Sequence, residues 1–222
     1  MKIIRVLPAF VLYCLLTPLS DASLAPLGQN HFAPTAITLD FSGFAVNPPT
    51  EVNGLVVNNV LFGVTENGLP TNGIVFVDGG LSSNNVTPPH IVSISNSNLA
   101  LEVSLPASMT QFGYGYAIFA LGSIPEATTM QLFSGITPVG SMDFLGAPDP
   151  AFTGGFAGVS STVPFDRAVL TFSALAPVFA VDNVTFANTA ANVPEQGWTL
   201  LLFAIGVCAV FYSPFRRHRL PA

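Results

Sequence analysis

Met109–Ala120 reads MTQFGYGYAIFA, and this stretch decides the fold class. Phe112, Tyr114, Tyr116 and Ile118 recur at every second residue, with small residues or glycines between most of them. A period of two predicts a β-strand that turns one face toward a core. The glycines opposite the aromatic rings predict tight packing of a second layer or a bend in the strand, and a ligand contact by Tyr114 and Tyr116 is the alternative interpretation.

Short β-rich runs with turn residues between them recur on both sides of this stretch. In Ala36–Phe41, for example, Ile37, Leu39 and Phe41 alternate with small or polar residues, which predicts a half-buried strand. None of the runs has the period of an amphipathic helix. We therefore predict an all-β domain at residues 35–187, a two-sheet β-sandwich of jelly-roll or lectin-like type. Its further strands are predicted at Gly54–Thr65, Gly73–Asp78, Ile91–Ser95, Leu99–Leu105, Thr128–Ser134, Ile136–Leu145, Gly155–Ser160, Phe165–Phe172 and Val178–Phe186.

The composition agrees with a folded, turn-rich β-protein. The 222 residues are 50% hydrophobic and 8% charged, which excludes a disordered chain. Phe, Gly and Pro each occur nineteen times, and this favours strands joined by many turns.

The distribution of charge excludes nucleic acid as a partner. Between Leu24 and Gln196 eleven acidic residues stand against one basic residue, Arg167. Nucleic-acid binding needs clustered Lys and Arg to displace phosphate counterions. An acidic surface is compatible with divalent cations or neutral glycans, and solubility alone is the simpler explanation of it.

The N-terminus has the features of a signal peptide. Lys2 and Arg5 precede an apolar run, Val6–Leu19, and Ser20 and Ala22 supply small residues near a cleavage point. We predict a signal helix at residues 1–22, cleavage by signal peptidase after Ala22, and an irregular lead-in at 23–34.

The C-terminus predicts a single membrane span. Gly197–Phe215 contains nineteen residues without Asp, Glu, Lys, Arg or His, enough to cross a hydrocarbon core of about 30 Å as a helix. Arg216, Arg217 and Arg219 follow and would keep the tail, 216–222, in the cytoplasm. A small, polar linker at 188–196 precedes the predicted transmembrane helix.

The sequence does not predict an enzyme. The domain has no cysteine, no Gly-x-Ser-x-Gly motif, and only His31 and His90 as candidate bases. Its carboxylates are scattered singly, and the histidines are too few for a zinc site. A hydrolase of the cell envelope is retained only as a third alternative.

Calcium is the one metal that the residues indicate. Asp40 lies on the first strong strand, and Asp182 and Asn183 lie on the last. Sandwiches commonly pair these strands, which would bring the oxygen ligands to one rim. In the alternative interpretation, Asp182 and Asn183 bond backbone amides at the end of the strand. No other cofactor is indicated.

Val193-Pro194-Glu195, the apolar run and the arginine cluster together resemble the PEP-CTERM sorting signal of Gram-negative bacteria, with Gln196 at the position of the second proline. The stretches 154–161 and 179–186, which read GGFAGVSS and FAVDNVTF, are similar to the domain ending found before such signals. The resemblance implies processing by an exosortase-type protease, with transient residence in the inner membrane. It also implies removal of the tail and delivery to the cell surface or an exopolysaccharide matrix.

We therefore expect an exported structural or adhesive protein that binds polysaccharide. The predicted ligand contacts are Tyr114, Tyr116 and the loop Ser82–Asn85. The alternative is a permanently anchored single-pass membrane protein whose ectodomain binds another protein.

Overall fold

The computed structural model describes residues 22–93, 98–176 and 178–189. The chain divides into two units, Met1–Thr189 and Ala190–Ala222, and every strand below belongs to the first. The predicted signal helix, sorting motif (Val193, Pro194, Glu195), membrane span and arginine cluster (Arg216, Arg217, Arg219) lie outside the described residues, apart from Ala22. Within those residues, no helix is long and apolar enough to cross a bilayer.

The described part of the chain is nearly all antiparallel β-structure, as predicted, and its one helical element is a short 3₁₀ turn, η2 (Gln29–His31). The strands are β1 (Leu24–Pro26), β2 (Ile37–Thr38), β3 (Val56–Val57), β4 (Val60–Glu66), β5 (Leu69–Pro70), β6 (Ile74–Val77), β7 (His90–Ser93), β8 (Leu99–Ile118), β9 (Ile124–Ser134), β10 (Thr137–Asp149), β11 (Phe152–Phe172) and β12 (Phe179–Ala187).

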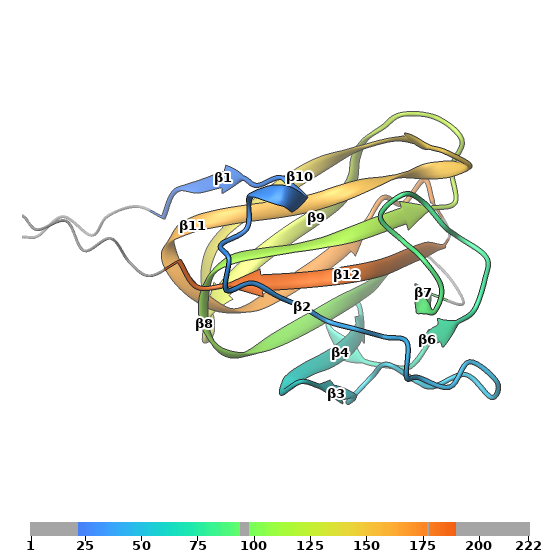
Figure 1. Ribbon diagram of the computed structural model, residues 1–222, viewed down its shortest axis with the longest axis horizontal. Helices are drawn as coiled ribbons and strands as arrows, with labels where there is room; N and C mark the ends of the chain where they lie inside the picture. Colours follow the sequence, from blue (N-terminus) through green and yellow to red (C-terminus); the bar gives the residue numbers. More distant parts are fainter. Residues whose placement is uncertain (1–21, 94–97, 177, 190–222) are drawn as a thin grey trace, which may run out of the picture. The chain divides into compact units, whose positions relative to one another are not determined.

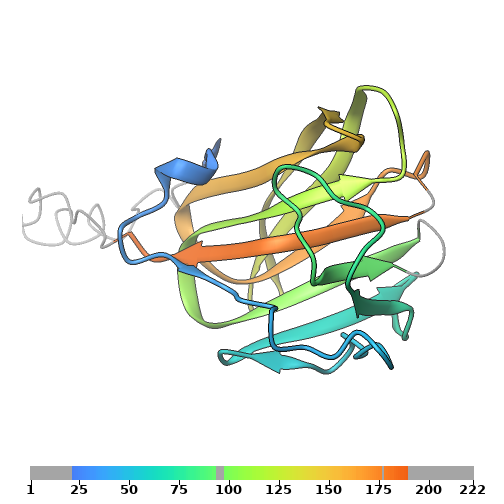
Figure 2. The same ribbon diagram turned by 45° about the vertical axis from the view of Figure 1, so that its right-hand side comes forward.

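Two long strands, β8 and β11, run through both layers of the β-sandwich. The first half of β8 pairs with β4 and with the second half of β11, which also pairs with β9. The second half of β8 pairs with β12 and with the first half of β11. Figures 1 and 2 show both strands turning over at the left-hand side. The two predicted sheets are therefore one continuous twelve-stranded sheet folded on itself.

The fold-over corrects the prediction of separate strands at Leu99–Leu105 and Met109–Ala120. Between Ser104 and Met109, β8 has no residue in register with a neighbouring strand. Pro106 lies in this gap, so its missing N–H removes no cross-strand hydrogen bond and the strand continues around the corner. The predicted strands at 155–160 and 165–172 merge into β11 for the same reason, with register shifts on both sides of Phe165.

The core lies between the two layers. The four alternating residues of β8, Phe112, Tyr114, Tyr116 and Ile118, are all buried in it, as their period predicted. At one end of the core the ring of Phe172 stacks on that of Phe179, with centroids 3.8 Å apart.

Strand β2 is shorter than predicted. Leu39 and Phe41 are buried, but Ile37 is 47% exposed, so its predicted inward orientation is wrong. Only Ile37 and Thr38 pair with β12, and the chain beyond them follows a turn in which the backbone N–H of Ser42 bonds the side chain of Asp40. A two-residue strand cannot impose strict alternation on its neighbours.

A loop covers the outer face of the layer that contains β12. Leu81 and Val86 of this loop are buried against Ala117 and Ala180. A Cβ added at Gly115 would lie 1.9 Å from the carbonyl oxygen of Asn85. The glycines of β8 thus serve close packing, which confirms the first of the two interpretations above.

Candidate functional site

Tyr114 and Tyr116 do not contact a ligand at the surface, and this prediction is wrong. Both rings are buried in the core, where their hydroxyls bond Thr128 Oγ1 at 2.5 Å and the Leu145 carbonyl at 2.8 Å. Burial raises the pKa of Tyr116 to about 12. A strand with a period of two can bury either of its faces, and here the aromatic face is the inner one.

The predicted contact loop, Ser82–Asn85, uses its polar groups within the protein. Asn84 donates from its backbone and side chain to Asp149. The carbonyl of Asn85 accepts a hydrogen bond of 2.9 Å from Asn183 Nδ2. These bonds attach the loop to neighbouring parts of the protein. The loop therefore packs over β12, and these polar groups are already used within the protein.

The structure brings Asp40, Asp182 and Asn183 together, as predicted. They line one pocket of about 380 Å³, which also includes Thr38–Ser42 and Thr87–Pro89. We call it the Asp182 pocket. Two distant parts of the chain meet here because β2 pairs with β12.

The carboxylates of the Asp182 pocket are bonded to the protein. Asp182 accepts bonds from the backbone N–H and hydroxyl of Thr87 at 3.0 and 3.2 Å, and from the backbone N–H of Asn183 at 2.7 Å. Asp40 accepts the backbone N–H and hydroxyl of Ser42, and these bonds lower its pKa. The described residues contain no group of three or more Asp, Glu, His or Cys suited to a metal. Calcium at this rim stays a prediction.

His90 lies beside this pocket and is fully buried. Neither ring nitrogen has a hydrogen-bond partner in the described part of the chain. Burial lowers the pKa of His90, and the charges of Asp182 and Asp78 and the backbone of Thr87 oppose that shift in part. The imidazole is therefore held in its neutral form.

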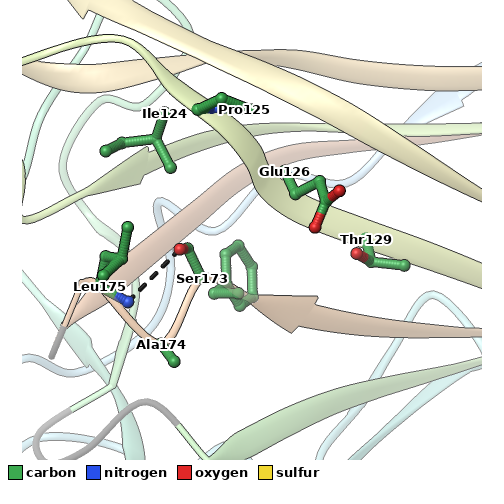
Figure 3. Close-up of a pocket in the computed structure, with 8 residues that line it drawn as sticks. Ile124, Pro125, Glu126, Thr129, Ser173, Ala174 and Leu175 are labelled. Atoms are coloured by element: carbon green, nitrogen blue, oxygen red, sulfur yellow. Dashed lines mark hydrogen bonds between the residues drawn. The ribbon is translucent and has the colours of Figure 1, made fainter.

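A second pocket has a volume of about 490 Å³. Its walls come from the start of β9 and the connection from β11 to β12 (Figure 3). We call it the Glu126 pocket. Its lining residues are Ile124, Pro125, Glu126, Thr129, Phe172, Ser173, Ala174 and Leu175.

Glu126 has an unusual backbone conformation in this pocket. Its φ is +44°, in the left-handed region, which costs an ordinary L-residue about 1–2 kcal/mol. Its exposed carboxylate forms no hydrogen bond or ion pair with the described residues. Figure 3 shows it projecting from β9 beside the pocket, across from Ser173 and Leu175. The pocket thus carries an anionic group that no residue in the described part of the chain neutralises.

The other walls combine hydroxyl and apolar groups. Ser173 Oγ accepts the backbone N–H of Leu175 at 3.4 Å, which leaves the hydroxyl proton free to donate. Thr129 Oγ1 bonds Asp143 at 2.6 Å. Leu175 is 75% exposed, whereas the ring of Phe172 is mostly buried beneath the pocket. Such a surface suits a small ligand that has both hydroxyls and C–H faces.

An exposed aromatic pair stands close to this pocket along the chain. Phe119 is 56% exposed, and its ring centroid lies 5.8 Å from that of the partly buried Phe152. With Ala120 and Leu121 the two rings line an apolar hollow of about 90 Å³. Sequence reasoning missed Glu126, Phe119 and Phe152, since no motif marks them. The only signals were Pro125 beside an acidic residue and aromatic rings next to predicted turns.

Comparisons with known proteins do not assign a family. No protein-family model and no curated protein matches the chain. Among solved structures, a mutant of CBM29-2, a family 29 carbohydrate binding module, is 14% identical over 58% of this chain and 89% of its own, with a TM-score of 0.32. Another CBM29-2 mutant, complexed with cellulohexaose, is 13% identical over 57% and 90%, with a TM-score of 0.31. The enzymatically active domain of bacteriophage CBA120 tailspike protein 4 is 14% identical over 59% of this chain and 19% of its own, with a TM-score of 0.34. TM-scores of this size do not establish a common fold, so the site is judged on its own residues.

Proposed function

We propose that this is an exported protein, sorted through a PEP-CTERM-type signal to the cell surface or extracellular matrix, whose β-sandwich binds polysaccharide in the Glu126 pocket. The observation that carries the binding role is the pocket itself, in which apolar side chains accompany a hydroxyl and a carboxylate that bonds none of the described residues. Its walls stand on strand ends and a loop held by a rigid sheet, a common position for binding sites.

The charge of the domain narrows the choice of ligand. Ten carboxylates lie between residues 22 and 189, against Arg167 as the single Lys or Arg. The guanidinium of Arg167 already contacts Glu102 at 3.4 Å and lies 4.1 Å from the centre of the Phe133 ring. An anionic polysaccharide would find no free arginine or lysine here, so the proposed ligand is uncharged or cationic.

Binding is tested with a glycan array on the purified Ser23–Asn192 domain, after circular dichroism shows that it is folded. We expect the wild-type domain to bind a glycan. The double variant Glu126→Ala/Ser173→Ala should have at least tenfold lower affinity, a loss of about 1.4 kcal/mol in binding free energy. Glu66→Gln, a carboxylate change on β4, is the matched control and leaves binding unchanged. A folded domain that binds no glycan contradicts the proposal.

Calcium binding is tested by repeating the array, and by measuring the melting temperature of the domain, with and without EDTA. A cation held by Asp40 and Asp182 would stabilise the domain, so EDTA would lower its melting temperature. If the melting temperature is unchanged by EDTA and by added calcium, the two carboxylates act only through their bonds to Ser42, Thr87 and Asn183.

Sorting is tested by fractionation of cells that express the full chain. The tripartite C-terminus motivates the expectation that the mature protein loses Arg216, Arg217 and Arg219 and reaches the surface or matrix. Pro194→Ala/Glu195→Ala should retain the uncleaved chain in the inner membrane. A wild-type protein that keeps its arginines and stays in that membrane would instead support the anchored, protein-binding alternative.

A further inference from the structure

We propose that Glu126 selects glycans that carry free amino groups, and that Phe119 and Phe152 stack a neighbouring sugar of the same chain. This inference rests on the proposed function and names its ligand class. It joins two features, an unpaired carboxylate in a pocket and an exposed aromatic pair, into one extended site.

The two features border a single segment of the chain. Leu121 lines the aromatic hollow and Ile124 lines the Glu126 pocket, three residues or at most about 11 Å apart. The backbone N–H of Thr153 bonds the carbonyl of Ala120 at 2.9 Å, and that of Ser173 bonds the carbonyl of Ala127 at 3.0 Å. Both walls are therefore tied to this segment, across which the proposed oligosaccharide would lie.

The backbone conformation of Glu126 singles it out. Five non-glycine residues in the described chain have positive φ, and the other four are asparagines, Asn58, Asn59, Asn67 and Asn183. Asparagine tolerates the left-handed region, whereas glutamate has no such preference. The carboxylate of this strained residue bonds none of the described residues and borders an exposed pocket, which makes it a candidate for ligand binding.

A carboxylate without a protein partner favours a cationic ligand. Glu126 shares the pocket with the apolar side chains of Ile124 and Leu175, and its carboxylate would attract an ammonium group bound between these walls. One carboxylate does not satisfy calcium, which takes six to eight oxygen ligands. An amine on the ligand is the simplest complement.

The aromatic pair identifies the rest of the ligand as a sugar. Phe119 and Phe152 offer apolar ring surface without a polar atom, to which the C–H face of a pyranose is complementary. The hydroxyl of Ser173 serves the hydroxyl groups of the same ligand. An amino-sugar chain provides all three partners, namely an ammonium group, a C–H face and hydroxyls.

The test measures binding of two soluble probes to the full chain in detergent, a glucosamine oligosaccharide and its fully N-acetylated form of equal length. We expect the wild type to bind the amine form about tenfold more tightly, or about 1.4 kcal/mol. Glu126→Gln should bring this ratio close to one, because it keeps the shape of the side chain and removes its charge. Phe119→Ala should weaken both probes by a similar factor, and Glu66→Gln should change neither.

The outcomes distinguish selection of amino groups by Glu126 from polysaccharide binding itself. Equal binding of both probes by the wild type, unaffected by Glu126→Gln, overturns the selection by charge and leaves the proposed polysaccharide binding intact. Binding of neither probe, nor of any glycan on the array, by a folded wild-type chain overturns both. If oligolysine binds the wild-type chain and Glu126→Gln weakens that binding, while no glycan binds, the cationic partner is a peptide and the inference is wrong.

Discussion

The two pockets contain similar groups and use them differently. Each combines a carboxylate with a residue in the left-handed conformation, Asp182 with Asn183 in one and Glu126 alone in the other. In the Asp182 pocket the carboxylate of Asp182 accepts three hydrogen bonds, and the side chain of Asn183 donates to the carbonyl of Asn85. In the Glu126 pocket the carboxylate bonds none of the described residues.

This difference separates a structural carboxylate from a candidate binding group. The bonds of Asp182 hold the loop over β12 and thereby contribute to the stability of the fold. The free carboxylate of Glu126 contributes nothing comparable, and its backbone conformation has a cost. Loss of the first should harm folding, and loss of the second should harm only binding.

The largest effect is expected from Gly115→Ala, which would push away the loop that contains Asn85 and packs on β8 and β12. The new Cβ would collide with the backbone carbonyl of Asn85, and backbone cannot move aside as a side chain does. We expect a loss of about 3 kcal/mol or more in urea unfolding. Gly79→Ala, where the added Cβ meets nothing, is the control. Equal stability of the two variants would show that the loop does not pack on β8.

Exchanging the two carboxylates for alanine compares the pockets directly. Asp182→Ala leaves the backbone N–H groups of Thr87 and Asn183 without their acceptor, and we expect a loss of about 2–3 kcal/mol. Glu126→Ala should leave the free energy of unfolding within about 0.5 kcal/mol of wild type. The distinction between the pockets fails if Glu126→Ala proves as destabilising as Asp182→Ala.

The pH dependence should identify the buried imidazole near Asp182. Because burial lowers the pKa of His90 below its ordinary 6.5, folding opposes its protonation. Stability from this group is complete above pH 6.5 and declines as the pH falls below it, by at most about 1.4 kcal/mol per pH unit. His90→Met removes the buried titratable group and should flatten this part of the curve. Melting curves between pH 5 and 8 measure it, and an unchanged slope in the variant would assign the effect elsewhere.

The smallest effect is expected from Glu126→Gly. Relief of the left-handed conformation is offset by the greater freedom of glycine in the unfolded chain, which leaves a net gain of about 0.5 kcal/mol. The same variant should lose glycan binding. A gain in melting temperature together with a loss of binding is the combination that a purely structural role of Glu126 does not produce.

Local pattern predicted the strands well and the sites poorly. The alternation in 109–120 placed Phe112 and Tyr114 on one face of a strand, and the structure agrees because burial of apolar side chains enforces a period of two. The glycines between the aromatic residues allowed either close packing or a ligand contact, and the sequence did not show that a distant loop packs on Gly115. The proximity of Asp40 and Asp182 was predicted from the expected pairing of the first and last strands, which is a property of the sheet as a whole.

The sequence by itself determined the all-β class, most strand positions and the acidic character of the domain, since these depend on residue type and short-range periodicity. The tertiary structure decided that β8 and β11 pass through both layers, that the aromatic face of β8 is buried, and that Glu126 borders a pocket. These features depend on contacts between residues far apart in the chain. Glu126 lies where the pairing of β9 with β10 shifts register, and its pocket exists only once the start of β9 meets the connection from β11 to β12.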